Sequence, residues 1–418
     1  MTGMLNSADR IQTTHAGSLP RTPELIAANE ARTFEADGFT LERTAEFEKL
    51  ESDAVADLVA RQKAIGITVP GDGEYGKAMS SAVDYGAWWS YSFQRVSGLS
   101  LTGDDIFSSE PVRSTPGNVQ LTTFPDRRDW TIFHEAYSDP SSGIGTGKGA
   151  TAFPSTTGPL AYVGQEAIAG DIANLKNGLA ASGLSEGFIT SLSPGSGSRV
   201  ANDYYATEEE HIWAWADVLR EEYTAIIDAG LILQIDDPSI AENWDQINPE
   251  PSIEDYRAFT RIRVEALNYA LRDLPQEQIR FHLCWGSWHG PHTTDIELKN
   301  IVDLMLEINA GAYSFEAANA RHEHEWKLWE DVTLPEGKLI LPGVIGHATN
   351  VVEHPELVAD RIERFASVVG RDNVIASTDC GLGGRIHPQI AWAKLDSLVA
   401  GAELATARLW GTSATTVR

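Results

Sequence analysis

The two cysteines of this chain lie in sequence contexts that suit metal binding. Cys284 follows His282 by two residues, and Cys380 lies in a separate segment 96 positions further along the chain. Because successive side chains of a β-strand point to opposite faces, a His-x-Cys pair presents its imidazole and thiol on one face. Imidazole nitrogen and thiolate sulfur are ligands that zinc prefers. Two unrelated buried thiols are the alternative, since free cysteine often behaves as a small hydrophobic residue.

A carboxylate is available to complete such a metal site. Glu316 follows the apolar segment 312–315 and is the natural third or fourth ligand. One His, two Cys and one Glu would give zinc a formally anionic centre, which is a poor Lewis acid for water. That centre suits a substrate thiol held as a nucleophilic thiolate, with the weak carboxylate ligand displaced. The ligand chemistry therefore favours alkylation at sulfur over hydrolysis.

The composition is that of a large globular protein. The chain has 418 residues, of which 42% are hydrophobic and 22% charged. Its formal charge of −28 argues against a nucleic-acid partner, which would need clustered Lys and Arg. The first 20 residues show no signal peptide, and no apolar run is long enough to span a membrane. We therefore expect a cytoplasmic protein with no membrane partner, and two distant cysteines fit that reducing compartment.

Short apolar runs alternate with longer helical segments, which is typical of repeated βα units around a parallel sheet. Helical spacing of apolar residues predicts helices at Phe39–Ile65, Glu208–Ala229, Ser252–Arg272 and His354–Val369. Nine segments are predicted as strands: Ile11–Ser18, Ile67–Glu74, Gly158–Val163, Gly187–Leu192, Leu231–Asp236, Arg280–Cys284, Ala312–Glu316, Lys338–Ile345 and Asn373–Asp379.

These elements predict an α/β fold, a single-domain (β/α)8 TIM barrel over residues 1–418. Eight strands close such a barrel, so one of the nine must be peripheral. An open doubly wound sheet is the alternative, but no Gly-x-Gly-x-x-Gly follows the first strand. The segment Tyr85–Ala150, rich in Gly, Ser, Pro and aromatic residues, breaks the rhythm. We expect it to be an insertion over the barrel's mouth, either a lid or an irregular structural excursion.

Polar residues gather where the predicted strands end. In (β/α)8 barrels the catalytic groups lie at the C-terminal ends of the strands. Ionisable groups at five or six such ends are hard to explain as isolated structural residues, because each unpaired buried charge costs several kcal/mol. The polar residues at strand ends are His15, Gly17, Ser18, Asp72, Glu74, Asp236, Asp237, His282, Cys284, Glu316, His347, Asp379 and Cys380.

Seven short motifs occur in the order seen in one enzyme family. They are Thr13–Pro20, Gly73-Glu74, Gln234–Pro238, His282–Cys284, Ser314–Glu316, Pro342–Val344 and Asp379–Gly381. In these motifs the chain resembles the C-terminal catalytic barrel of cobalamin-independent methionine synthase, over nearly its whole length except the 85–150 insertion. The family's N-terminal barrel has no counterpart here.

The resemblance implies roles for particular residues. The implied zinc ligands are His282, Cys284, Glu316 and Cys380. Gly17 and Ser18 match groups that hold the homocysteine carboxylate, and Glu74 and Asp236 match the pair that grips its amino group. Glu242 matches a carboxylate at the pterin of the methyl donor. The proton donor to the departing group is expected to be His347 or Glu242.

The sequence thus predicts a zinc-dependent S-methyltransferase that alkylates a homocysteine-like thiol through a zinc-bound thiolate. The related epoxyalkane:coenzyme M transferases suggest an alternative, in which a thiol adds to another electrophile. Two carboxylates would repel the sulfonate of coenzyme M, which favours the amine-bearing thiol. A non-catalytic zinc-binding protein is the alternative of another class. The methyl or alkyl donor stays open.

Overall fold

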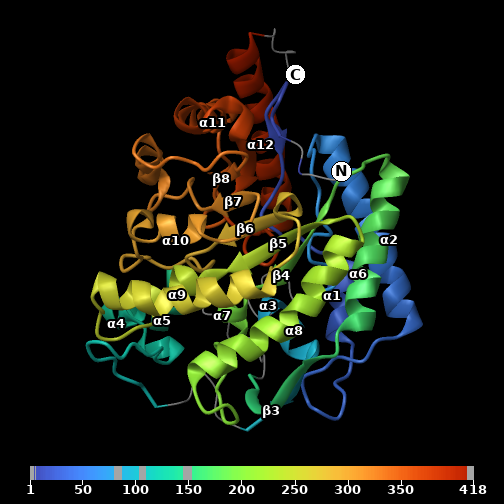
Figure 1. The fold of residues 1–418 in the computed structure, drawn as a ribbon. Coiled ribbons are helices and arrows are strands. Elements are labelled where there is room, and N and C mark those ends of the chain that lie inside the picture. The colour runs from blue at the N-terminus through green and yellow to red at the C-terminus, as the bar shows by residue number, and fades with distance from the viewer. Residues whose placement is uncertain (1–3, 5, 80–86, 103–109, 145–152, 412–418) are drawn as a thin grey trace.

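The computed structural model describes residues 4, 6–79, 87–102, 110–144 and 153–411. Its main sheet has seven strands in the order β1-β9-β8-β7-β6-β5-β4, and every neighbouring pair is parallel (Figure 1). The strands are β1 Gln12–Thr13, β4 Phe188–Leu192, β5 Ile232–Asp237, β6 Ile279–Leu283, β7 Ala312–Phe315, β8 Leu339–Ile345 and β9 Ile375–Thr378.

An irregular segment, residues 67–71, occupies the eighth position between β1 and β4. The backbone N–H of Val69 donates to the carbonyl of Thr13 in β1 at 3.0 Å. On the other side, the N–H of Phe188 in β4 donates to the carbonyl of Pro70 at 3.1 Å. The barrel is therefore closed, although the regular strand predicted at Ile67–Glu74 is wrong. Pro70 has no N–H to donate, so a regular ladder cannot continue through it.

One of the nine predicted strands, Gly158–Val163, is peripheral. Residues Ser155–Tyr162 form β3, which pairs only with β2 (Val96–Ser100) in an antiparallel two-stranded sheet. The expectation that one of nine strands lies outside the barrel is confirmed. The predicted (β/α)8 class is confirmed as well.

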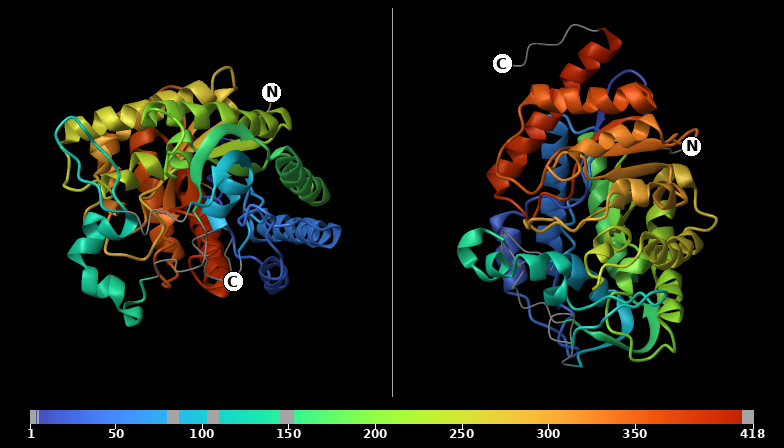
Figure 2. Two further views of the ribbon diagram at one scale, coloured as in Figure 1. Left: turned by 90° about the horizontal axis from the view of Figure 1, so that it is seen from below. Right: turned by 90° about the vertical axis from the view of Figure 1, so that its left-hand side faces the viewer.

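Helices form the outer layer and cover the sheet (Figure 2). Those that follow the barrel strands are α1 Pro23–Glu30, α2 Ala45–Ile65, α6 Gln165–Ser182, α7 Pro194–Gly197, α8 Glu208–Asp228, α9 Ile253–Ala270, α10 Val302–Leu306, α11 Pro355–Val369 and α12 Pro388–Trp410. Shorter 3-10 turns are η3 Pro238–Ile240, η4 Glu242–Trp244, η5 Gln276–Gln278, η6 Leu298–Asn300, η7 Glu323–Glu330 and η8 Arg371–Asn373. None of these helices is long and apolar enough to cross a lipid bilayer, within the part of the chain that the structure describes.

Local capping sets where the predicted helices begin. Thr207 caps α8 by accepting from the N–H of Glu210 at 3.1 Å. The helix predicted at Phe39–Ile65 begins later, at Ala45, because Thr44 caps it by accepting from the N–H of Phe47. The other three predicted helices, α8, α9 and α11, are confirmed to within two residues at each end.

The interrupting segment, which is the predicted 85–150 insertion, contains short elements of its own. These are α3 Ala87–Gln94, η1 Phe124–Asp126, α4 Arg128–Ile132, α5 His134–Ser138 and η2 Pro140–Ser142, in addition to β2. Parts of the predicted 85–150 insertion, namely 85–86, 103–109 and 145–150, lie outside the described residues. The role of the insertion as a lid stays a prediction.

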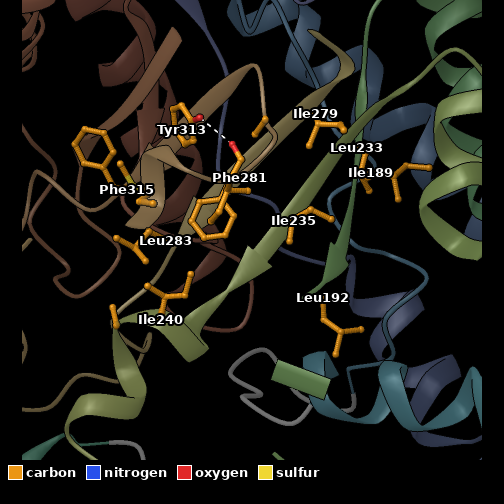
Figure 3. Close-up of a cluster of buried hydrophobic side chains, with 14 of the residues drawn as sticks. Ile189, Leu192, Leu233, Ile235, Ile240, Ile279, Phe281, Leu283, Tyr313 and Phe315 are labelled. Carbon is orange, nitrogen blue, oxygen red and sulfur yellow. Dashed lines mark hydrogen bonds between the residues drawn. The ribbon is translucent and has the colours of Figure 1, made fainter. Parts of the chain in front are cut away.

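Apolar side chains from the strands pack into the helix layer. Figure 3 shows this cluster, in which Ile235 of β5 lies beside Phe281 of β6 and Leu233 lies beside Ile279. These four side chains are fully buried, together with Trp215 and Tyr223 of α8. Since side chains alternate along a strand, the intervening residues must point into the barrel.

The barrel interior is polar at the level of these residues. Arg280 of β6 donates to Gln234 of β5 at 2.6 Å and, across the barrel, to Thr14 Oγ1 at 3.0 Å. Its guanidinium also lies 3.4 Å from the ring centroid of Phe188. Burial lowers the pKa of Arg280 to about 9. A buried guanidinium therefore ties β6 to β5 and to the end of β1.

A substitution at the closing segment tests this closure. A Cβ on Gly71 would lie 2.6 Å from the ring of Phe188, which is fully buried. We expect Gly71→Ala to lower the free energy of unfolding by about 1–3 kcal/mol, because an overpacked core must shift. Gly170 in α6 is the control, since a Cβ there meets nothing within 4 Å. Gly170→Ala should leave stability unchanged or raise it by up to about 1 kcal/mol in urea denaturation.

Candidate metal and thiol site

Three predicted metal ligands meet at the C-terminal ends of β6 and β9. Ligand atoms of His282, Cys284 and Cys380 all lie within 4.8 Å of one another. The two sulfurs are 3.8 Å apart. Two thiolates at ~2.3 Å from one tetrahedral ion would be separated by roughly 3.8 Å, so the sulfur spacing fits zinc.

The imidazole of His282 is also oriented to bind a metal ion. Its Nδ1 shares a hydrogen bond of 3.0 Å with Ser314 Oγ on β7, while Nε2 is buried, and among the described residues no hydrogen bond to it meets normal geometry. Metal-bound histidines usually have their second nitrogen fixed in this way. The hydrogen bond from Cys284 holds the pKa of Cys380 well below that of an ordinary thiol. The donor set therefore fits a soft divalent ion such as Zn²⁺.

The predicted fourth ligand, Glu316, lies beside this triad and not within it. One of its oxygens comes within 4.8 Å of ligand atoms of both His347 and Asp379. Its Oε1 accepts from the N–H of Trp285 at 3.1 Å, and its Oε2 accepts from Asn319 at 2.7 Å. Three ligands with a carboxylate alongside match an open catalytic site better than a closed structural one.

His347 is buried next to these carboxylates at the end of β8. Burial lowers the pKa of its imidazole to about 3, so the ring is neutral at pH 7. Its Nδ1 is buried and makes no hydrogen bond with any described residue. An unpaired imidazole nitrogen of this kind is a candidate for proton transfer.

The residues predicted to bind the thiol substrate lie at the ends of the other barrel strands. Gly17 follows β1 with a φ of 113°, and a Cβ there would lie 2.8 Å from Glu74 Oε1. Asp236 is the last residue but one of β5, next to His282 of β6, and accepts from Gln234 Nε2 at 2.6 Å. Burial raises the pKa of Asp236 to about 7. Glycine at position 17 thus leaves room for the Glu74 carboxylate.

Ser18 connects these predicted acceptor-binding residues to the loop that carries Cys380. Its carbonyl accepts from the N–H groups of Leu382 and Gly383, each at 2.9 Å. Its hydroxyl donates to the carbonyl of Gly383 at 3.0 Å. The Ser18 loop therefore packs directly against the glycines that follow Cys380.

Glu242, in the loop after β5, forms a buried ion network. Arg199 contacts both of its oxygens at 3.1 Å, and Arg127 Nη2 contacts Oε1 at 2.5 Å. Although burial opposes it, the charges of the two arginines lower the pKa of Glu242 to about 2. The Arg127 guanidinium also lies 4.5 Å from the ring centroid of Trp288. Glu242 is thus a permanently charged counter-ion for two guanidinium groups.

Arg127 belongs to the interrupting segment, which is attached to the loops after β5 and β6. Asp129 accepts from the N–H and the hydroxyl of Thr293, both at 2.9 Å, and from the hydroxyl of Tyr137 at 2.9 Å. The N–H of Asp129 donates to Asp245 at 2.9 Å. Residues 122–137 are therefore fixed to the C-terminal face of the barrel by buried polar contacts.

Sequence reasoning missed several partners of the predicted site residues. Lys77, Thr190 and Asn319 contact the predicted carboxylates, and Arg127 and Arg199 surround Glu242. Lys77 is three residues from Glu74 and Asn319 is three residues from Glu316, so local spacing could have suggested these two. The contacts with Thr190, Arg127 and Arg199 span 116, 115 and 43 residues and depend on the fold.

The buried network predicts a large effect of neutralising Glu242. Glu242→Gln would remove the carboxylate that Arg199 and Arg127 share, and Arg127 would keep only Asp245, whose Oδ2 lies 3.6 Å from its Nε. We expect a loss of about 3–5 kcal/mol in the free energy of unfolding, measured by urea denaturation at pH 7. Lys49→Met is the control, because its ion pair with Asp53 is exposed and should contribute less than about 1 kcal/mol.

The same network fixes the sign of a pH effect. A depressed carboxyl pKa stabilises the fold above the unfolded pKa of about 4.3, and this contribution is lost as the pH falls towards 2. The stability difference between the wild type and Glu242→Gln should therefore shrink below about pH 4. A difference that stayed constant from pH 7 to pH 3 would contradict the ion-pair assignment.

Comparison with known proteins identifies the relatives of this chain. Residues 171–404 match the family described as the catalytic domain of cobalamin-independent synthase. The chain is 25% identical over 204 residues to the methionine synthase of Thermococcus kodakarensis, covering 49% of this chain and 52% of that protein. It is 25% identical over 242 residues to 2-hydroxypropyl-CoM lyase of Xanthobacter autotrophicus, covering 51% and 59% respectively. The matches span just over half the length of these curated relatives.

A solved structure supports the fold. The chain superposes on the B12-independent methionine synthase of Shewanella sp. W3-18-1, determined in complex with selenomethionine, with a TM-score of 0.66. The two sequences are 21% identical, and the alignment covers 96% of this chain and 99% of that one. At this identity the likeness establishes the shared architecture.

Proposed function

Because the chain belongs to the family of cobalamin-independent synthase catalytic domains, we propose that it is a zinc-dependent S-methyltransferase that alkylates a small amine-bearing thiol. Membership of this family supports a transferase of the methionine-synthase type. The zinc, the thiol acceptor and the individual residue roles are what we propose beyond that. The approach of the two sulfurs to 3.8 Å beside an unpaired His282 Nε2 is the observation that carries the proposal.

His282, Cys284 and Cys380 would hold the zinc, with Glu316 as the exchangeable fourth ligand. When bound, the ion stabilises a substrate thiol in its thiolate form. Two thiolate ligands make the centre electron-rich, which suits a sulfur nucleophile better than a water molecule. The carboxylate of Glu316 has hydrogen-bond donors of its own, Trp285 N–H and Asn319, so it can leave the ion without becoming an unpaired buried charge.

Glu74 and Asp236 would hold the ammonium group of the thiol substrate, while Gly17 and Ser18 would receive its carboxylate. Both carboxylates are buried, so an ammonium group bound between them would form strong charge-assisted hydrogen bonds. An acceptor held at both ends of its amino-acid moiety would present its sulfur in one direction. Orientation of this kind supplies much of the rate enhancement of a bimolecular transfer.

His347 is the better of the two predicted proton-transfer groups. The ion pairs of Glu242 keep it charged far below neutral pH, so it has no proton to donate. His347 has a buried Nδ1 with no hydrogen-bond partner among the described residues, so this nitrogen would be free to take up the proton that the thiol releases. It would then return that proton to the departing group after methyl transfer.

A second candidate function is addition of a thiol to an electrophile other than a methyl donor. The similarity to 2-hydroxypropyl-CoM lyase favours it, since the metal chemistry would be the same. The acceptor pocket argues against coenzyme M itself, because that thiol has no ammonium group to pair with Glu74 and Asp236. The choice between the two functions therefore depends on the thiol and on the electrophile.

Removal of one thiolate ligand tests the metal site. Cys380→Ser should weaken zinc binding by more than about 100-fold, which exceeds the loss expected for an outer-shell partner. It should also abolish methyl transfer. Zinc content would be measured after dialysis against a competing chelator. Ser314→Ala, which removes the hydrogen bond to His282 Nδ1, is the matched control and should lose roughly 10–100-fold. Stoichiometric zinc retained by Cys380→Ser would refute the ligand assignment.

A panel of thiols crossed with methyl donors tests the reaction. We expect the zinc-loaded protein to form an S-methyl product from homocysteine and not from coenzyme M, detected by mass spectrometry. The panel of donors should include methylated folates. Turnover of coenzyme M with an epoxide, and none of homocysteine with any methyl donor, would favour the second function.

A further inference from the structure

Glu74 is held in an uncommon backbone conformation. Its φ is 61°, in the left-handed region that non-glycine residues seldom adopt. The N–H of Glu74 donates to Asp72 Oδ1 at 2.9 Å, and Arg21 Nη2 donates to the carbonyls of Glu74 and Lys77. A strained residue persists only where its surroundings fix it, and such residues cluster at functional sites. The turn at residues 72–77 is therefore fixed by a buried guanidinium.

The side chain of Lys77 returns from this turn to the Glu74 carboxylate. Its Nζ lies 3.1 Å from Glu74 Oε1 and donates to Thr190 Oγ1 at 2.6 Å. Thr190 in turn donates to the same Oε1 at 2.7 Å. The ammonium group also lies 4.4 Å from the ring centroid of Tyr91. Lys77 is only 4% exposed, so this is a buried charge with a fixed set of partners.

These contacts treat the two carboxylate oxygens of Glu74 differently. Oε1 carries the contacts with Lys77 and Thr190 and faces Gly17. Oε2 accepts no hydrogen bond from the described residues. Although burial opposes it, the charge of Lys77 lowers the pKa of Glu74. The carboxylate is thus kept ionised, with one oxygen occupied and the other available.

We propose that Lys77 is a positioning residue that selects amine-bearing thiols, by holding Glu74 so that Oε2 faces the ammonium group of the acceptor. The inference rests on the proposed thiol acceptor and deepens it. Lys77 also balances the charge of the pocket. Glu74 and Lys77 cancel, so Asp236 supplies the net negative charge for an acceptor that carries both an ammonium and a carboxylate group. Without Lys77, two uncompensated carboxylates would repel the acceptor's own carboxylate.

A purely structural ion pair is the competing explanation for Lys77. It would stabilise the fold without regard to the substrate, so its loss should affect all thiols alike. A positioning role predicts that the loss depends on the ammonium group of the thiol. Three thiols separate these cases: homocysteine, 3-mercaptopropylamine, which has no carboxylate, and 4-mercaptobutyrate, which has no ammonium group.

The test compares Lys77→Met with Lys77→Arg in the zinc-loaded full-length protein. Binding of each thiol is measured by titration calorimetry, and KM and kcat for methyl transfer are measured separately. We expect Lys77→Met to weaken homocysteine binding by about tenfold or more, as for loss of a charged hydrogen-bond partner. The affinity ratio of homocysteine to 4-mercaptobutyrate should fall by a similar factor. The effect should appear in KM more than in kcat, and Lys77→Arg should restore most of the ratio.

Each outcome distinguishes this role from the proposed function. An equal loss for all three thiols, or no loss for any, would overturn the positioning role. A wild-type protein that binds amine-bearing thiols no better than 4-mercaptobutyrate would overturn it as well. Selective binding of amine-bearing thiols with no methyl transfer from any donor would support the role of Lys77 and refute the proposed methyl transfer. A change in the melting temperature alone, with the affinity ratios intact, counts against the proposal.

Discussion

The site depends on the alternation of side chains along parallel strands whose C-terminal ends meet around one closed barrel. Leu233, Ile235 and Phe281 point into the helix layer, so Gln234, Asp236 and His282 must point inward. Near the strand ends, inward-pointing side chains from strands far apart in sequence therefore lie close together. The irregular segment 67–71 closes the barrel. This closure places Glu74 next to Gly17, which follows β1. A one-residue shift in any strand would turn its polar residue into the apolar layer.

A barrel lined with acids and cysteines must also compensate its buried charges. Four buried cations do this at different levels. Arg280 contacts Gln234, which in turn donates to Asp236, and Lys77 pairs with Glu74. Arg127 and Arg199 neutralise Glu242 at the mouth. Carboxylates that are fully paired, such as Glu242, act as structural charges, whereas Glu316 and Asp379 have amide donors and no adjacent Lys or Arg in the contacts described. The distinction between a binding carboxylate and a structural one is thus a matter of its partners.

Much of the fold could be predicted from the sequence, because its signals are local. Short apolar runs located most of the barrel strands and the peripheral β3, and the helical spacing of apolar residues located α8, α9 and α11. The approach of Cys284 and Cys380 followed from placing both at strand ends of one barrel. The segment Ile67–Glu74 was predicted too regular. Pro70 interrupts the strand ladder, and the positive φ of Glu74 belongs to a turn whose carbonyl groups bind Arg21. The partners of Glu242 could not be predicted, since Arg127 comes from a segment without any periodic signal.

The order of strands around the barrel gives the site its polarity. The proposed metal ligands and His347 come from the neighbouring strands β6, β7, β8 and β9. The proposed acceptor-binding groups come from β1, the closing segment, β4 and β5, which complete the ring on the other side. A small thiol that spans the barrel mouth would therefore place its sulfur over one half and its charged end over the other. The two halves meet where Ser18 contacts the loop after Cys380 and where β5 adjoins β6. Those contacts set the distance between the sulfur and the charged groups of the acceptor, so they limit the length of thiol that the site can align for transfer.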